Sequence, residues 1–272
     1  MMFRNFLLLC SAVLIFNSCQ KNSITGRKQL ILVSESELQQ MSTQQYQAFL
    51  SKNRVMPSAA NRDAEMVKRV GRRISGAITE FYTQQGKTQL LSGYKWEFNL
   101  VEDKSVNAWC MPGGKVVVYT GLLPVANNES YLAVVMGHEI AHALAQHGNE
   151  RMSQGLVQEL GGVALSVAVA SQPSATQALF MDAYGIGSTV GGVLPFSRKQ
   201  ELEADRYGLI FSAMAGYDPR EAVPFWEKMS KIGGSENKPP EFLSTHPSDE
   251  TRINKVREYA NEAMKYYKTN PR

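Results

Sequence analysis

Two histidines and a glutamate stand close together in the segment His138-Glu139-Ile140-Ala141-His142. In an α-helix, positions i and i+4 lie on the same face one turn apart, so both imidazoles could bind one metal ion. Glu139 would lie about 100° round the helix from His138, where its carboxylate could reach a water molecule on that ion without binding the ion. These residue types at this spacing predict zinc-dependent hydrolysis: zinc lowers the pKa of the water and polarises a carbonyl group, while the glutamate passes a proton to the leaving amine.

The competing interpretation of this segment is a chance match on an exposed helix. Four histidines occur in the 272 residues, which makes an accidental pair at this spacing uncommon. The sequence before the motif is apolar from Leu132 to Met136, and Ile140, Ala141 and Ala143 surround its polar residues. A charged group on so apolar a helix would be costly to bury without a metal or a function. We therefore predict one Zn2+ ion per chain.

A catalytic zinc ion usually has three protein ligands and a water molecule. Glu201 is the predicted third ligand, and Asp205 shares its helical face at i+4. Asp205 is predicted to accept a hydrogen bond from the outer nitrogen of a ligating histidine. Glu201 could instead be an exposed carboxylate paired with Arg198 or Lys199. The corresponding alternative for Asp205 is a salt bridge to Arg206 or Arg198.

Two polar residues near these motifs are expected to face away from the ion. His147 would lie about 140° round a continuous helix from His142, which predicts an exposed side chain. Glu203 would lie roughly opposite Glu201 on its own helix.

The first twenty residues form a segment of different character. Arg4 precedes an apolar run from Phe6 to Phe16, which is too short to span a bilayer but has the length of the apolar centre of a secretory signal. Ser18-Cys19 follows, and the segment resembles a bacterial lipoprotein signal, in which the cysteine is acylated after cleavage. The alternative is a plain secretory signal with an incidental cysteine.

This pattern divides the chain into a signal peptide over residues 1–18, a lipid-anchored tether and N-terminal segment over 19–33, and a single domain over 34–272. The polar stretch from Gln20 to Lys28 is expected to be the tether. The protein would be exported to the periplasm or cell envelope and anchored to a membrane, with the outer membrane favoured. The net charge of +4 comes without a long basic run, so nucleic-acid binding is not indicated.

The apolar pattern predicts an α+β fold that is mainly helical. Ser34 and Glu37 form the capping-box signal of one helix start. Residues 94–101 and 115–120 predict two strands, with a turn at 112–114 before the second. Further helices are expected over residues 61–82, 129–148, 152–170, 197–215, 218–229 and 248–266, with a loop over 231–242.

Three further segments carry motifs, in addition to the histidine motif and the Glu201 and Asp205 pair: Thr25–Leu30, Asn107–Leu123 and His246–Arg252. Together these motifs resemble the M48 family of zinc metallopeptidases, in particular its bacterial lipoprotein and periplasmic members and those like OMA1 and BepA. The resemblance extends over nearly the whole chain after the signal. It implies a single peptidase domain with a gluzincin-like fold, in which a small β-sheet carries an edge strand beside the active-site helix.

The resemblance also identifies a strand that would bind substrate: Asn107, Ala108, Trp109, Cys110 and Met111. An edge strand can hold an extended peptide through backbone hydrogen bonds, with little demand on the peptide's sequence. The alternative is an ordinary strand and turn. Cys110 is expected to pack in the interior, and a reactive thiol is the other interpretation.

In relatives, a histidine similar to His246 is implicated in reaching the metal and blocking the water position, which would make His246 the gate of a self-inhibited enzyme. A transition-state hydrogen-bond donor and a simple helix-start histidine are the alternatives. Arg252 would either stabilise a developing oxyanion or pair with a carboxylate.

The predicted function is that of a zinc-dependent endopeptidase of the bacterial cell envelope that degrades or processes misfolded or misassembled envelope proteins. Its partners would be unfolded or extended polypeptides, and the membrane through acylated Cys19. A non-catalytic, metal-stabilised chaperone or assembly factor is the main alternative, and a hydrolase of non-peptide substrates is a third. Glu139 separates the first two, because a purely structural metal site needs no general base.

Overall fold

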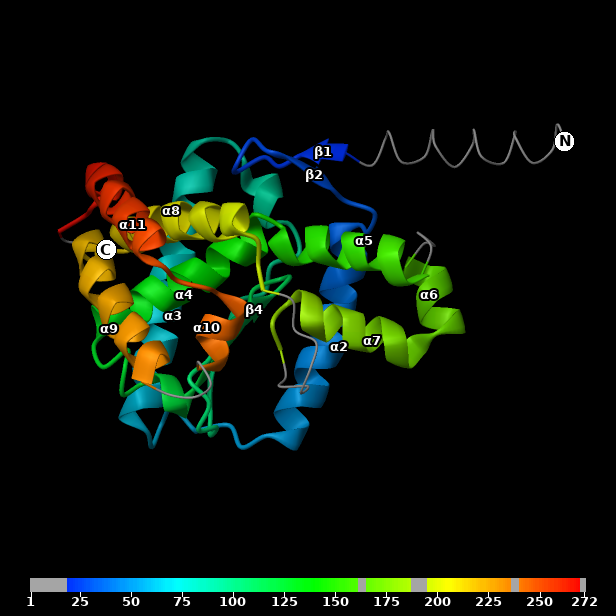
Figure 1. The fold of residues 1–272 in the computed structure, drawn as a ribbon, viewed down its shortest axis with the longest axis horizontal. Helices are drawn as coiled ribbons and strands as arrows, with labels where there is room; N and C mark the ends of the chain where they lie inside the picture. The colour runs from blue at the N-terminus through cyan, green and yellow to red at the C-terminus, as the bar shows by residue number, and fades with distance from the viewer. Residues whose placement is uncertain (1–18, 161–164, 187–194, 236–239, 270–272) are drawn as a thin grey trace, which may run out of the picture.

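A buried helix, α4 (Glu129–Leu144), runs through the middle of the fold with α8 (Arg198–Met214) beside it (Figure 1). This computed structural model describes residues 19–160, 165–186, 195–235 and 240–269; the predicted signal, 1–18, lies outside the described residues. Every residue of α4 from Leu132 onward is buried, as its apolar sequence predicts.

The two central helices begin at side chains that cap their free backbone N–H groups. Asn128 caps α4 by accepting a hydrogen bond from the N–H of Tyr131. Ser197 forms a capping box with Gln200 at the start of α8, and this fixes where the helix with the predicted third ligand begins.

The backbones of α4 and α8 touch where glycines replace side chains. A Cβ atom added to Gly208 would lie 2.7 Å from the backbone nitrogen of His138 and 2.8 Å from the carbonyl carbon of Gly137. A Cβ atom on Gly137 would lie 2.5 Å from the hydroxyl of Ser212, which donates a hydrogen bond to the carbonyl of Ala133 at 2.8 Å. The two glycines therefore bring His138 close to the helix that carries the carboxylates.

A three-stranded sheet packs against α4, and its strand order is β3-β5-β4. β3 (Glu97–Val101) is parallel to β5 (Lys115–Tyr119), and β4 (Ala108–Met111) is antiparallel to β5. β4 is thus an edge strand beside α4, the helix with the histidine motif, as the resemblance implied. The apolar pattern predicted β3 and β5 but missed β4, which only the resemblance identified, because all four positions of β4 are buried and show no alternation.

The other helices surround this centre, and α5, α6 and α7 extend to one side of it (Figure 1). Their bounds are α2 (Glu35–Lys52), α3 (Arg62–Gln84), α5 (His147–Leu160), α6 (Leu165–Ser171), α7 (Pro173–Ala183), α9 (Ala222–Ser235), α10 (Glu241–Thr245) and α11 (Glu250–Ala263). The capping box predicted for Ser34 and Glu37 starts α2. The loop expected over 231–242 is shorter than predicted, since α9 continues to Ser235; residues 236–239 lie outside the described residues.

The helix expected over 129–148 is broken at Gln146. α4 ends at Leu144, Gln146 has a φ of 56°, and α5 begins at His147. Positive φ is uncommon for a residue other than glycine, so no local pattern of residues indicates this break. His147 consequently starts a new helix and is fully buried, and the prediction of an exposed side chain was wrong.

The segment that was expected to be a tether packs onto the domain. β1 (Cys19–Lys21) and β2 (Lys28–Leu30) form an antiparallel hairpin. The side-chain amides of Asn22 and Gln29 are buried, and both donate to the carbonyl of Ala145 at 2.9 Å. The hairpin therefore packs against the C-terminal end of α4, in the segment for which the sequence indicated a tether over residues 20–28. In the part of the chain that the structure describes, no helix has the length and apolarity needed to cross a membrane.

We expect Gly208→Ala to lower the free energy of unfolding by about 1–3 kcal/mol, because the new methyl group would meet backbone atoms that cannot move aside. Gly76→Ala in α3 is the matched control, since a Cβ atom there has nothing within 4 Å, and it should stabilise the protein by about 0.5–1 kcal/mol. Urea unfolding of both variants measures the difference. Equal stability of Gly208→Ala and the wild type would contradict the close helix contact.

Candidate metal centre

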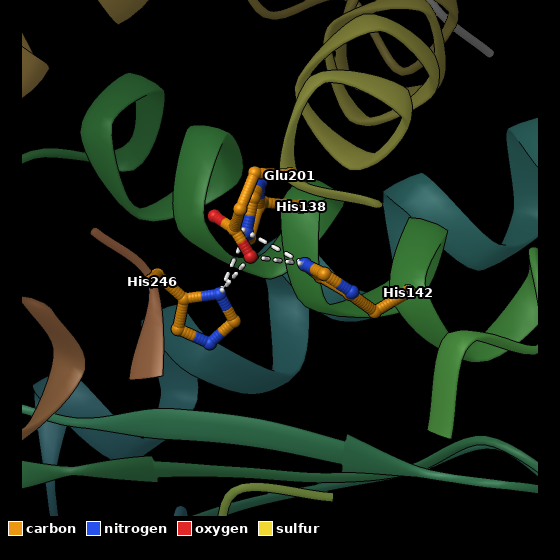
Figure 2. Close-up of side chains that lie close together, drawn as sticks. All are labelled: His138, His142, Glu201 and His246. Atoms are coloured by element: carbon orange, nitrogen blue, oxygen red, sulfur yellow. Dashed lines mark hydrogen bonds and ion pairs between the residues drawn. The ribbon is translucent and has the colours of Figure 1, made fainter. Parts of the chain in front are cut away.

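Four side chains from three parts of the chain converge beside α4 (Figure 2). They are His138 and His142 of α4, Glu201 of α8, and His246, which follows α10. One ligand atom of each lies within 4.8 Å of the others, and the four side chains belong to residues only 1–4% exposed. The predicted ligand set and the predicted gate thus meet at one point, and the alternative of an exposed Glu201 paired with Arg198 or Lys199 is wrong.

The spacing of these atoms fits a tetrahedral metal site. Zinc bonds of about 2.0–2.1 Å place tetrahedral ligands about 3.3–3.4 Å apart. The Nε2 atom of His138 lies 3.0 Å from Nε2 of His142 and 3.2 Å from Nδ1 of His246. Oε1 of Glu201 lies 3.3 Å from Nε2 of His142 and 2.9 Å from Nδ1 of His246. Three nitrogens and an oxygen at these distances are a donor set suited to zinc.

Asp205 and Arg252 support the cluster from outside. Oδ1 of Asp205 lies 3.0 Å from Nδ1 of His138, on the side of the ring away from the cluster. Arg252 donates to both oxygens of Asp205 at 2.8 and 2.9 Å, and its third nitrogen lies 2.5 Å from Oε2 of Glu201. Arg252 therefore has the contacts of a carboxylate partner, and it takes the place that Arg206 or Arg198 would have had beside Asp205.

Burial and charge set the protonation of the ligands. Burial lowers the pKa of His138 and, more strongly, that of His142, which favours the neutral imidazoles that bind metals. Burial alone would raise the pKa of Glu201, but the facing Arg252 and His246 hold it well below its usual value. The cluster thus presents lone pairs from two neutral rings and an ionised carboxylate.

Glu139 lies beside the cluster and outside the ligand set. Burial raises the pKa of its carboxyl group to about 7. Its Oε1 atom has no hydrogen-bond partner among the described residues and lies 3.4 Å from Nε2 of His246. A carboxylate with a pKa near neutrality, next to a metal site, is suited to accept and return a proton.

His246 is held in place by aromatic side chains and by its own backbone. Its ring stacks on Phe242 at 4.6 Å and on Phe196 at 5.1 Å between centroids. Its N–H donates to the carbonyl of Phe242, and its carbonyl accepts from Arg252. A histidine that only started a helix would not need these contacts, so they favour a role at the cluster over that alternative.

The predicted substrate strand lies next to this cluster and is covered in this structure. The Asn107 amide donates to the carboxylate of Glu241 at 3.1 Å, and the N–H of Phe242 donates to the carbonyl of Val106. Helix α10 therefore lies against the start of β4. Burial raises the pKa of the Cys110 thiol well above its usual value, which supports the packing interpretation over a reactive thiol.

The sequence is similar to those of known metallopeptidases, as a metal-binding cluster of this kind would lead one to expect. Residues 65–260 match the profile of peptidase family M48. The chain is 37% identical over 174 residues to the mitochondrial metalloendopeptidase OMA1 of Schizosaccharomyces pombe, covering 64% of this chain and 49% of that protein. It is 29% identical over 265 residues to the metalloendopeptidase OMA1 of Homo sapiens, covering 94% of this chain and 49% of that protein.

A bacterial relative is the β-barrel assembly-enhancing protease of Escherichia coli, with 33% identity over 174 residues, 61% of this chain and 35% of that protein. The chain thus spans about half or less of the length of these three relatives. The profile covers most of the chain and includes the histidine motif, Glu201 and Asp205. Because the same residues build the buried cluster between α4 and α8, we conclude that this chain belongs to peptidase family M48.

Proposed function

We propose that this protein is a zinc-dependent endopeptidase. The observation that carries the proposal is the cluster of His138, His142 and Glu201 with the buried Glu139 beside it and outside the ligand set. A zinc ion bound there would lower the pKa of a water molecule and polarise the substrate carbonyl. A non-catalytic site, as in the chaperone alternative, would not need a carboxylate in the position of Glu139.

In this proposal, the residues around the ligands transfer the proton, orient the ligands and bind the substrate. Glu139 accepts a proton from the attacking water and donates it to the leaving amine, and its pKa of about 7 suits both directions of transfer. Asp205 fixes the ring of His138, and Arg252 holds the two carboxylates of α8. The substrate is an unfolded or extended polypeptide that pairs with β4, where residues 107–111 would supply the backbone hydrogen bonds.

We further propose that His246 keeps the enzyme in a closed resting state. Its Nδ1 atom lies 3.2 Å from Nε2 of His138 and 2.9 Å from Oε1 of Glu201, so His246 would be a fourth ligand of a bound metal and would take the position that catalysis needs for water. Opening would require His246 to leave the cluster together with α10, which also lies against the start of β4. One movement would thus open both the metal position and the substrate strand.

We place this activity in the bacterial cell envelope, on misfolded or misassembled proteins. The lipoprotein-like segment that ends at Cys19 supports export and a lipid anchor, with the outer membrane favoured, and the name of the E. coli relative refers to β-barrel assembly. Residues 34–272 would form the peptidase domain, with the hairpin of 19–30 as an addition to it.

Glu139→Gln should lower cleavage of unfolded casein by about 10²–10⁴-fold, because the amide cannot accept the proton of the attacking water. Zinc content should stay at that of the wild type, since Glu139 is outside the ligand set. Casein cleavage and bound zinc are measured on the same preparations. Equal cleavage by the two proteins would reject the peptidase assignment and favour the chaperone alternative.

His246→Ala should raise the rate of casein cleavage severalfold or more, because it frees the fourth position of the metal site. The double variant His246→Ala with Glu139→Gln is the control, and it should stay as inactive as Glu139→Gln alone. Lower activity of His246→Ala on every substrate tested would rule out the gate and support a transition-state role.

A further inference from the structure

The two ligand histidines of α4 have different partners behind them. His138 has the carboxylate of Asp205 at its outer nitrogen. His142 directs Nε2 into the cluster, and its outer nitrogen, Nδ1, lies 3.0 Å from Nδ1 of His147. His147 is fully buried, and its own Nε2 lies 2.9 Å from a carboxylate oxygen of Glu203. A second imidazole is thus placed between His142 and the carboxylate.

Only one pair of tautomers of His142 and His147 leaves Nε2 of His142 free to bind a metal and keeps both hydrogen bonds. If Nε2 of His142 keeps its lone pair for a metal, its Nδ1 carries the proton and donates to Nδ1 of His147. His147 must then carry its proton on Nε2, where it donates to the carboxylate of Glu203. The ionised carboxylate of Glu203 can only accept a hydrogen bond. It therefore fixes the direction of the bond from His147, and through the tautomer of His147 the direction of the bond from His142.

Glu203 is in turn held by the N-terminal hairpin. Nε of Arg27 donates to its two oxygens at 2.8 and 3.0 Å, and the other two nitrogens of Arg27 donate to Glu150 at 2.6 Å each. The three side chains are 9–16% exposed. Gln200 adds a hydrogen bond to Glu150 at 2.9 Å. Arg27 therefore joins the hairpin to α5 and α8 through charge-assisted, forked contacts.

We propose that His147 is a positioning residue that holds His142 in its metal-binding tautomer, and that the docked hairpin supports it through Arg27 and Glu203. The inference rests on the metal site of the proposed function, but it concerns metal affinity and not cleavage. Partners of this kind are worth about 10–100-fold in metal affinity. Because coupling between two sites is reciprocal, metal binding should also tighten the docking of the hairpin.

The first test compares zinc affinity, measured by competition with a chelator, in the full chain and its variants. His147→Leu should weaken zinc binding about 10–100-fold, and His147→Gln, whose amide can both accept and donate, should recover part of the loss. Arg27→Met should weaken zinc binding less than His147→Leu, since it acts through Glu203. Arg206→Met is the control: it breaks a similar forked pair between α8 and Glu262 that does not reach the cluster.

Unfolding of the zinc-free proteins is measured beside affinity. A purely structural role would lower the stability of His147→Leu and Arg27→Met and leave their zinc affinity equal to that of Arg206→Met, which would overturn the proposal. The outcome is independent of peptidase activity. A wild type that binds zinc but cleaves nothing would reject the proposed function and leave this inference intact.

Hydrogen exchange tests the reciprocal effect. Adding Zn2+ should slow exchange of the amides of residues 19–30 in the wild type, and this slowing should be lost in Arg27→Met and kept in Arg206→Met. Equal exchange with and without zinc in the wild type would contradict coupling between the hairpin and the site.

Discussion

The contact between the backbones of α4 and α8 sets the geometry on which the rest of the site depends. Each helix by itself fixes only its own pair, His138 with His142, or Glu201 with Asp205, at i and i+4. His138, His142 and Glu201 can share one ion, and Asp205 can reach His138, only if the helices lie closer than most side chains would allow, and Gly208 provides that approach. The sheet and the C-terminal helices then pack around ligands whose relative positions this contact has already determined.

Burial of charge is the second constraint, and it accounts for the residues that surround the ligands. Glu139, Glu201 and Asp205 are buried carboxylates, and Arg252 is the buried guanidinium that faces two of them. When all four are ionised, these side chains together carry a net charge of −2. A divalent cation would balance it, which explains why so polar a cluster can be accommodated in the interior beside the apolar helix α4.

The parts of the site that the sequence predicted are those whose geometry is local. The spacing of Glu201 and Asp205 on one helix, and the capping box of Ser34 and Glu37, follow from local helix geometry alone. The partner of Asp205 could not be derived in that way, because Arg252 is 47 residues distant in the chain and meets it only through packing. The hairpin was missed for a related reason: its strands have three residues each and show no apolar period.

The break at Gln146 is where the local prediction failed, and the failure has a structural consequence. In a continuous helix, positions i and i+5 do not face each other, so His147 could not have reached His142. The left-handed residue between them redirects the chain, and the two rings come to lie 4.9 Å apart between centroids. An unfavourable backbone conformation next to a polar site persists only where the surrounding structure holds it. The carbonyl of Ala145, bound by Asn22 and Gln29 of the hairpin, is part of that support, so the hairpin stabilises both the break and the contact that the break makes possible.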